Sequence, residues 1–331
     1  MALPGSVLKN RQGINFSSFT IIILTLLLGA GLTLTSKTFL SANNFLSILY
    51  GVSFNFFGAI GFTCLMIMGE LDLSVGSVYA LSGMIVGLLM RNHVPLIPSL
   101  AAALVISAAI GFINGFFVVK FKVASMMVTL GTMAAIRGCA NFLCTKLYGY
   151  PYRASYQALS RVRIGGIYLT IIIMVVAAII LEILLKRATV FKKMFIVGEN
   201  LETARIYGIK AGRLKIIIFV ITALLSGVGG ILIGARQRFA DVSIGNGLEF
   251  TILTAVVLGG ASLTGGKGSI FRALIGLIFL AMITTGMIIH NIEPLIQQLI
   301  VGIILIITVF IDTRMGRLRE AGHRAVKKGV A

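Results

Sequence analysis

The sequence predicts an all-α membrane protein with about ten transmembrane helices, some of them broken or re-entrant, and one short helix on the cytoplasmic side. Three observations lead to this fold class. Hydrophobic residues make up 58% of the 331 positions and charged residues only 12%, whereas soluble domains carry about 25% charged residues. Apolar runs of about 20 residues, the length that crosses a bilayer, recur along the chain. The basic residues gather in alternate connections between these runs.

Ten apolar runs are candidate spans. The eighth is short and ends in glycine, so we expect a broken or re-entrant helix there. The candidates cover residues 19–35, 45–68, 73–90, 96–119, 124–144, 166–185, 214–234, 249–263, 270–289 and 293–311.

The charge distribution places both termini in the cytoplasm. With ten spans and an internal N-terminus, 20 of the 29 basic residues fall in cytoplasmic segments and 8 in external ones, while Arg137 lies within a span. Basic residues favour the cytoplasmic side, so this bias supports both the orientation and the even number of spans. It also accounts for the net charge of +19. We expect no nucleic acid as a partner, because no basic stripe carries interleaved aromatic residues.

The chain lacks the signatures of an enzyme or a motor. A phosphate-binding loop requires G-x-x-x-x-G-K-[ST], and the nearest approach, at residues 260–269, has a glycine after Lys267. The three histidines lie near loops or the tail, and the three cysteines lie in apolar runs without metal-site spacing. We therefore expect no catalytic residue, no metal site and no cofactor bound by this chain.

Two acidic residues lie at the end of the second candidate span. Glu70, Asp72 and Ser74 alternate with leucines between two glycines, a pattern that suits a break between helices. Acidic groups at membrane depth are costly and tend to be functional. One interpretation is a hinge, pathway element or gate. The other is a capping turn with Asp72 at the N-cap of the next helix, and the two are compatible.

Further polar residues interrupt apolar spans. Thr129 and Thr132 share one helix face, and Arg137 follows near mid-membrane, where it needs a carboxylate, helix C-terminal carbonyls or water. Asn55 and Asn114 add neutral hydrogen-bonding groups. Such groups suit a polyol-like solute. The alternative is that the threonines and asparagines are present because they stabilise helix–helix packing.

The inner segment 197–210 predicts a short amphipathic helix. Asn200 is suited to cap it, Glu202 favours its first turn, and Gly208 ends it. A short cytoplasmic helix between long spans favours docking of a soluble partner. The alternative is a helix that lies on the lipid surface.

Four sequence blocks stand out in order along the chain. They read GELDLSVGS at 69–77, VTLGTM with a following Arg-Gly pair at 128–138, GENLETARIYG at 198–208, and VLGGASLTGGKGS at 257–269. Together they resemble a known family, the permease subunits of bacterial ABC sugar importers of the ribose, xylose, galactose and autoinducer-2 type. The departures from the family pattern are Glu70 in place of a glycine, Thr203 in place of a first alanine, and Met126-Met127 in place of Phe-Ile.

The resemblance implies a multi-pass permease of a bacterial cell (inner) membrane that imports a monosaccharide or related polyol-like solute. Its parts would be a cytoplasmic N-terminal segment at 1–18, a polytopic permease domain at 19–311 and a basic cytoplasmic tail at 312–331, close to membrane lipid. The implied partners are a cytoplasmic ABC ATPase that holds ATP and Mg, a periplasmic or extracellular solute-binding protein, and a second permease copy or a paralogue. The ATPase would be coupled through Gly198, Glu199, Asn200, Ala204, Arg205 and Gly208.

Three alternatives remain at this stage. A branched-chain amino-acid ABC permease shares the expected architecture. An ion-coupled secondary transporter would work without a partner ATPase. An anchor that only recruits a cytoplasmic protein would not need Arg137 for uptake.

Overall fold

The structure, a computed structural model, describes residues 16–329, with side chains described for residues 20–314. It confirms the all-α prediction, because its single sheet consists of two strands of two residues each. The helices are α1 (Phe16–Thr35), α2 (Ala42–Ile67), α3 (Val75–Arg91), α4 (Leu96–Lys120), α5 (Ser125–Leu147), α6 (Ala154–Arg161), α7 (Leu169–Arg187), α8 (Thr189–Glu199), α9 (Leu201–Ile206), α10 (Ala211–Arg236), α11 (Leu248–Leu258), α12 (Ile270–Ile289) and α13 (Pro294–Gly329).

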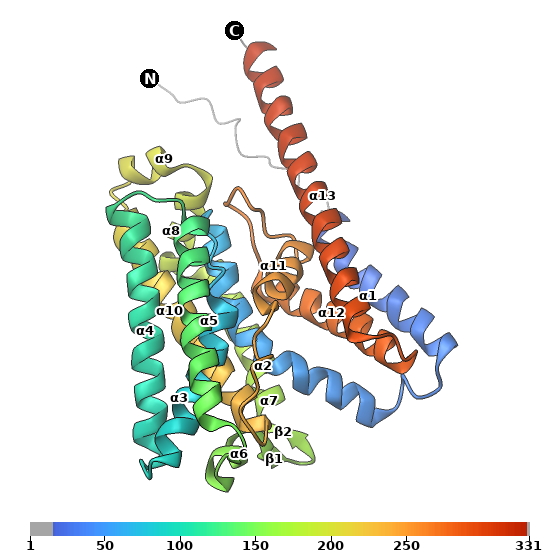
Figure 1. Ribbon diagram of the computed structural model, residues 1–331. Helices are drawn as coiled ribbons and strands as arrows, with labels where there is room; N and C mark the ends of the chain where they lie inside the picture. Colours follow the sequence, from blue (N-terminus) through green and yellow to red (C-terminus); the bar gives the residue numbers. More distant parts are fainter. Residues whose placement is uncertain (1–15, 330–331) are drawn as a thin grey trace.

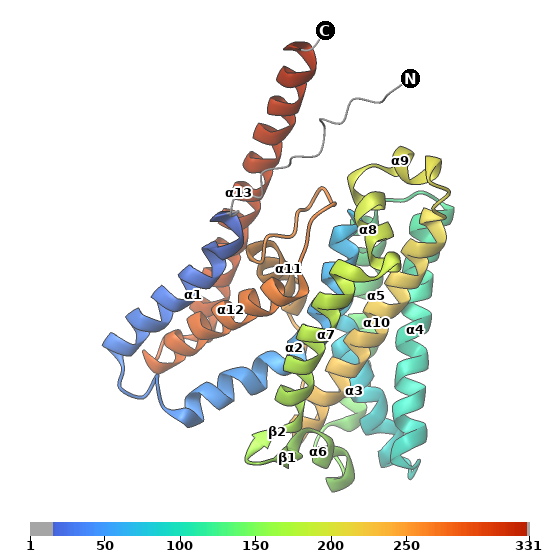
Figure 2. The ribbon, with the colours of Figure 1, turned by 180° about the vertical axis from the view of Figure 1, so that it is seen from behind.

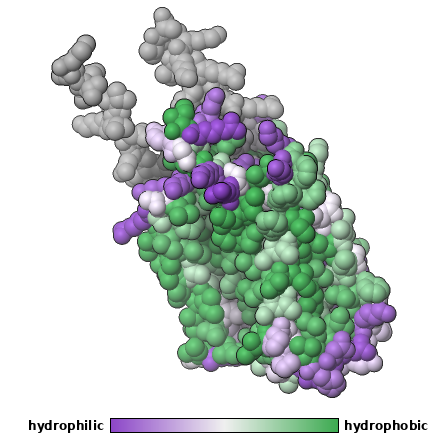
Figure 3. Space-filling model, turned by 90° about the vertical axis from the view of Figure 1, so that its left-hand side faces the viewer, coloured by the Kyte–Doolittle hydropathy of each residue, from purple (hydrophilic) through white to green (hydrophobic). Residues whose placement is uncertain are grey.

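Seven helices in the described part of the chain are long and apolar enough to cross a membrane, namely α2, α4, α5, α7, α10, α12 and the first part of α13. The other three candidate spans form shorter apolar helices, α1, α3 and α11. Each candidate span thus corresponds to one helix, but the count of ten spanning helices is not confirmed. Figure 3 shows the physical basis on one face, where hydrophobic residues form a broad band between polar ends.

The two ends of the bundle are distinct (Figure 1). One end carries α9, the turn that precedes α12 and the projecting part of α13, and we call it the α9 end. The opposite end, which we call the hairpin end, carries α6 and the hairpin formed by β1 (Arg163–Ile164) and β2 (Ile167–Tyr168). Gly165 and Gly166 both have positive φ, as a tight two-residue hairpin turn requires.

Helix α10 lies against α2, α3 and α4 and forms the centre of the bundle. Small residues permit this close packing. A Cβ on Gly111 of α4 would lie 2.5 Å from the carbonyl oxygen of Phe219 and 2.7 Å from Cβ of Ala223, both on α10. Gly111 therefore permits the close packing of α4 against α10. A second group, α1, α11, α12 and α13, packs beside it (Figure 2).

Several boundaries differ from the predictions. The eighth candidate span was expected at 249–263, but α11 ends at Leu258 because Gly259 and Gly260 begin a turn, and Gly260 has positive φ. The predicted helix at 197–210 is divided, since Asn200 adopts extended backbone between α8 and α9. At the C-terminus, α13 continues without a break past residue 312, where the tail was expected to begin. The N-terminal segment 1–18 lies mostly outside the described residues.

Candidate translocation and coupling sites

The turn between α2 and α3 brings together several of the predicted site residues. Gly69 has a φ of +74°, which lets the chain leave α2 sharply. The Asp72 carboxylate accepts hydrogen bonds from the backbone N–H of Ser74 at 2.9 Å and from its hydroxyl at 2.6 Å. The N-cap residue of α3 is Ser74, two positions after Asp72. One interpretation of the sequence placed Asp72 at the N-cap, and this is wrong. Asp72 instead stabilises the turn that leads into α3 by these two hydrogen bonds.

Two neighbouring helices hold this turn in place. The amide of Asn114 on α4 donates to the Ser74 hydroxyl at 3.0 Å. The backbone N–H of Leu71 donates to the hydroxyl of Ser125, the first residue of α5, at 3.2 Å. One carboxylate oxygen of Asp72 and the side-chain oxygen of Asn114 are buried and accept no hydrogen bond from the described residues. The cluster thus retains two spare acceptors next to a break between helices.

Glu70 is tied to the first turns of α10. Its carboxylate forms an ion pair with the Lys215 ammonium group, and the two side chains are only 11% and 19% exposed. A buried charge requires such a partner. The pair links the α2–α3 turn to α10, the helix that follows α9.

Arg137 lies on α5 and binds a segment that touches the first turn of α3, where a Cβ on Gly76 would lie 2.3 Å from the carbonyl oxygen of Gly245. Its guanidinium group donates to the carbonyl oxygens of Ile244 and Gly245, both at 2.7 Å. These carbonyls belong to the turn that precedes α11 and not to a helix C-terminus. Arg137 also interacts electrostatically with the carboxylate of Glu249, so one of the predicted kinds of partner is present. Glu249, in the first turn of α11, is 4% exposed, and one of its carboxylate oxygens has no hydrogen-bond partner among the described residues.

The remaining predicted pathway residues do not join either group through side-chain hydrogen bonds. The hydroxyls of Thr129 and Thr132 donate to carbonyl oxygens of their own helix, at 2.8 Å and 3.1 Å. This arrangement fits the packing interpretation, because neither hydroxyl is left without a partner. Asn55 is partly buried on α2, and no hydrogen bond of its side chain is found within the described residues.

The predicted coupling segment has the local structure that its sequence indicated. The Asn200 side chain accepts from the backbone N–H groups of Glu202 and Thr203 at 2.8 and 3.0 Å, so it caps α9. Gly208, with a φ of +69°, follows the end of that helix. Ala204 is fully buried and faces the bundle, whereas Glu199 and Arg205 are exposed. The exposed apolar side chains at this tip are Leu201, Ile206 and Tyr207.

A close backbone contact joins the coupling segment to the core. A Cβ on Gly198, near the end of α8, would overlap the carbonyl oxygen of Ile67 and would lie 2.7 Å from the backbone nitrogen of Gly266. That nitrogen donates to the same Ile67 oxygen at 2.8 Å. Position 198 therefore accepts only glycine without a shift of the backbone, and α8, the end of α2 and the turn before α12 meet at one point.

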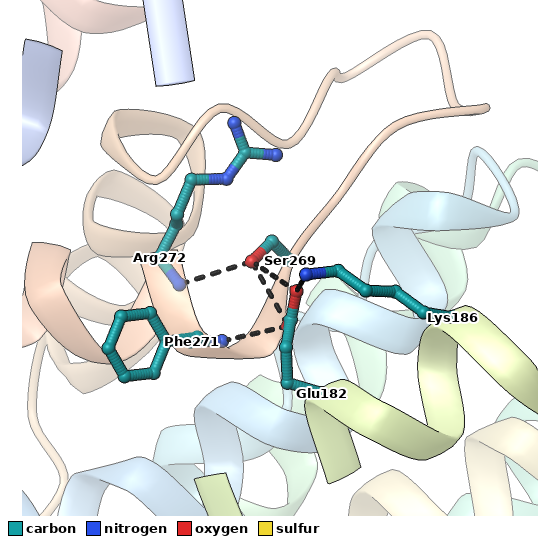
Figure 4. A network of polar contacts seen from close by, with 5 residues as sticks. All are labelled: Glu182, Lys186, Ser269, Phe271 and Arg272. Atoms are coloured by element: carbon teal, nitrogen blue, oxygen red, sulfur yellow. Dashed lines mark hydrogen bonds and ion pairs between the residues drawn. The ribbon is translucent and has the colours of Figure 1, made fainter. Parts of the chain in front are cut away.

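A second connection joins α7 to the N-terminus of α12 (Figure 4). The Glu182 carboxylate accepts from the Ser269 hydroxyl at 3.0 Å and from the backbone N–H of Phe271 at 3.1 Å. The Ser269 hydroxyl in turn accepts from the backbone N–H of Arg272 at 3.2 Å, which caps the helix. Lys186 approaches the same carboxylate at 3.0 Å. Thus α12 is attached to α7 directly ahead of α8.

Residues 44–309 match the family described as branched-chain amino acid transport system / permease component. The chain belongs to this permease family. It is therefore a multi-pass membrane protein, and this agrees with the apolar helices described above.

Curated relatives of the permease span nearly its whole length. It is 31% identical over 322 residues to the L-arabinose ABC transporter permease protein of Azospirillum brasilense. This alignment covers 97% of this chain and 91% of the relative. The ribose import permease protein of Bacillus subtilis is 31% identical over 284 residues, 85% of this chain and 88% of the relative. The ribose import permease protein of Escherichia coli K12 is 30% identical over 302 residues, with 88% and 92% covered. No solved structure matches.

Three charged residues of the permease were missed as site candidates. Glu249 stands alone in an apolar run and Glu182 near the end of another, so each carried the signal that was used for Glu70. Lys215 was counted only in the charge balance, since no sequence signal connects it with a carboxylate 145 positions earlier.

Proposed function

We propose that this permease is the membrane subunit of an ABC importer that carries a monosaccharide or a related polyol-like solute into the cell. The observation that carries the proposal is the alignment with an arabinose permease over 97% of the chain, together with the ribose permeases. The buried oxygens of Asp72 and Asn114 that accept no hydrogen bond within the described residues suit the hydroxyl groups of such a solute. In this proposal the chain binds no cofactor, and ATP and Mg are bound by a partner ATPase.

The α9 end faces the cytosol in this proposal, and both termini lie on that side. Eight basic residues between Lys186 and Lys215 support this orientation, because they surround α8 and α9. The ATPase docks on the exposed tip of α9, where Glu199, Leu201, Arg205, Ile206 and Tyr207 are accessible. Gly198, Asn200, Ala204 and Gly208 shape and seat the segment. A solute-binding protein meets the hairpin end, and a second permease copy or a paralogue completes the membrane unit.

Transport by the reconstituted complex tests the proposal. The permease is placed in proteoliposomes with its ATPase and binding protein, and ATP-driven uptake is measured for ribose, L-arabinose, xylose, galactose and a branched-chain amino acid. We expect one sugar to be taken up and to stimulate ATP hydrolysis. Uptake of the amino acid alone would favour a branched-chain amino-acid permease, the second candidate, which the description of the matching family supports. Uptake by the permease alone, abolished when an ion gradient is collapsed, would identify a secondary transporter.

A further inference from the structure

A tyrosine hydroxyl group is inserted into the backbone hydrogen bonding of α2. The Tyr79 hydroxyl, which comes from α3, donates to the carbonyl oxygen of Phe54 and accepts from the backbone N–H of Gly58, both at 2.9 Å. In a regular α-helix each N–H pairs with the carbonyl oxygen four positions earlier, so these two groups would pair with each other. A side chain of α3 thus bridges one turn of α2.

Helix α2 changes direction along its length, as both Figure 1 and Figure 2 show. Sharp bends in helices have few causes, and one of them is a side chain inserted into the backbone hydrogen-bond ladder. Proline, another of these causes, does not occur in α2. The Tyr79 hydroxyl therefore supplies a physical reason for the bend. Asn55, a predicted pathway residue, lies within the bridged turn, so its position depends on the bend.

Glycines make room for the Tyr79 ring between α2 and α10. A Cβ on Gly58 of α2 would lie 2.9 Å from the hydroxyl oxygen, and a Cβ on Gly229 of α10 would overlap this oxygen. The Tyr79 side chain is fully buried. Because the space ends at the two backbone groups of α2, a phenylalanine at this position would fill it without bridging them.

The bridged turn has an alternative in which its backbone groups are also paired. If the turn straightens, the Gly58 N–H can donate directly to the Phe54 carbonyl oxygen. That oxygen has a second lone pair, so it can still accept from the Tyr79 hydroxyl. Neither arrangement leaves a buried backbone group unpaired, which is the costly outcome. The turn therefore has two bonded arrangements, as a conformational switch requires.

The two halves of α2 are fastened to different elements. Before the bend, the Tyr50 ring stacks on the ring of Tyr168 in β2, with 3.8 Å between centroids. After the bend, a Cβ on Gly61 would lie 2.5 Å from Cα of Thr222 on α10. This half ends at Ile67, whose carbonyl oxygen accepts from the turn before α12 and lies against α8. A change in the bend therefore moves the hairpin end relative to α8 and α10.

We infer that Tyr79 is a positioning residue for transport, whose hydroxyl holds α2 bent between Phe54 and Gly58 in one conformation and releases this turn in the other. Tyr79 does not contact the solute and acts only through α2. The inference rests on the proposed function, because it assigns the bend a role in the transport cycle.

The first test compares two buried tyrosines in the reconstituted complex. Tyr79→Phe keeps the ring and removes the bridge, so ATP-driven uptake is expected to fall at least tenfold while ATP hydrolysis stays within twofold of wild type. Tyr156→Phe is the matched control. Tyr156 is equally buried, but its hydroxyl donates to the carbonyl oxygen of Ile231 at 3.0 Å and, in the described part of the chain, accepts from no backbone N–H. Uptake by the control should stay within twofold of wild type.

A second variant separates the bridge from a general loss of packing. Gly58→Ala brings a methyl group against the Tyr79 hydroxyl and should lower uptake at least tenfold. In the Tyr79→Phe background this oxygen is absent, so the same substitution should lower uptake by a much smaller factor. Equal factors in the two backgrounds would show that the positions act independently, and this result overturns the inference.

Distances between spin labels report the bend itself. In a background without the three native cysteines, the labels are placed at Phe45→Cys, an exposed site in the first turn of α2, and at Lys193→Cys, an exposed site on α8. Labelled permease is diluted with unlabelled permease, so that only label pairs within one chain contribute. ATP with vanadate should shift the distances in the wild-type complex. Tyr79→Phe should shift them to longer values without nucleotide, because a straighter α2 separates its ends.

The outcomes distinguish the inference from the proposed function. Distances that nucleotide leaves unchanged in the wild type overturn the inference, and this measurement needs no substitution at Tyr79. Uptake by Tyr79→Phe equal to that of wild type overturns it as well. Either result, together with normal wild-type uptake, leaves the proposed function standing. If the wild-type complex shows no ATP-driven uptake, the proposed function itself fails.

Discussion

At the scale of single residues, the ion pair between Lys215 and Glu70 is the contact to test first, because both side chains lie mostly inside the bundle. Removing one partner of a buried ion pair costs about 3–5 kcal/mol, because the other charge is left unpaired. Since the two side chains keep 11% and 19% of their exposure, we expect Lys215→Met to lower the free energy of unfolding by an amount near the lower end of this range. Denaturant titration of the purified chain in mild detergent measures the loss.

The neighbouring Lys210 supplies the control for this prediction. It is exposed and forms no ion pair within the described residues, so Lys210→Met should change the free energy of unfolding little. The exchanged pair Glu70→Lys/Lys215→Glu should recover most of the lost stability. Equal unfolding curves for Lys215→Met and Lys210→Met would show that the pair contributes nothing.

Single residues also show how much of the candidate site could be predicted from the sequence. Asn200 and Gly208 were predicted correctly as the cap and end of a helix, because capping depends on groups within a few positions along the chain. Arg137 was correctly expected to need acceptors. The identity of those acceptors, 107 and 108 positions away, depends on how the turn before α11 folds back, and no local pattern contains it.

At the scale of elements, the junction at Gly198 is the mechanical link between α8 and the core. Gly198→Ala places a methyl group onto the carbonyl oxygen of Ile67, so α8 must move away from the end of α2. We expect ATP-driven uptake to fall at least tenfold, while the chain still inserts and the complex still hydrolyses ATP. Uptake and ATP hydrolysis are measured on the same proteoliposomes.

Gly131→Ala is the matched control for the junction. Gly131 is also within a helix, but a Cβ there would meet no heavy atom within 4 Å. Uptake by this variant should remain near the wild-type rate. Normal coupled uptake by Gly198→Ala would mean that the close contact does not transmit movement.

Two substitutions in the connection between α7 and α12 separate the capping role of the Glu182 carboxylate from its ion pair with Lys186. Glu182→Met leaves the backbone N–H of Phe271 and the Ser269 hydroxyl without their acceptor. Loss of a helix cap costs about 0.5–2 kcal/mol, and we expect a decrease near the upper end in the free energy of unfolding. Lys186→Met removes only the partner that is 72% exposed, and such pairs contribute at most about 1 kcal/mol. Equal losses in the two variants would contradict a capping role for Glu182.

Helix boundaries were predicted well for the long apolar spans. They were predicted less well where glycines with positive φ end a helix. The long spans agree with the predicted runs within a few residues, because a lipid-facing helix must stay apolar over its length. The region from Gly259 to Ser269 was partly assigned to a helix, since its apolar residues continue across Gly259 and Gly260. The positive φ at Gly260, Gly265 and Gly266 converts it into a turn.

At the scale of the whole molecule, the proposed function depends on which end faces the cytosol. The basic residues around α8 and α9 favour the cytosolic side for the α9 end, yet four arginines of the hairpin end, which lie in or near α6, β1 and the end of α10, oppose the same rule. Labelling of single cysteines decides the orientation. In a background without Cys64, Cys139 and Cys144, the positions to compare are Tyr207→Cys, at an exposed site on the α9 end, and Ile164→Cys, at an exposed site on the hairpin.

On intact cells, a membrane-impermeant maleimide should label Ile164→Cys and leave Tyr207→Cys unlabelled. Permeabilised cells provide the control, since both cysteines should then react. The expected contrast follows from the two ends lying on opposite sides of an apolar band that the reagent does not cross (Figure 3). Labelling of Tyr207→Cys on intact cells would place α9 outside, and an ATPase in the cytosol could then not reach the segment that is proposed to receive it.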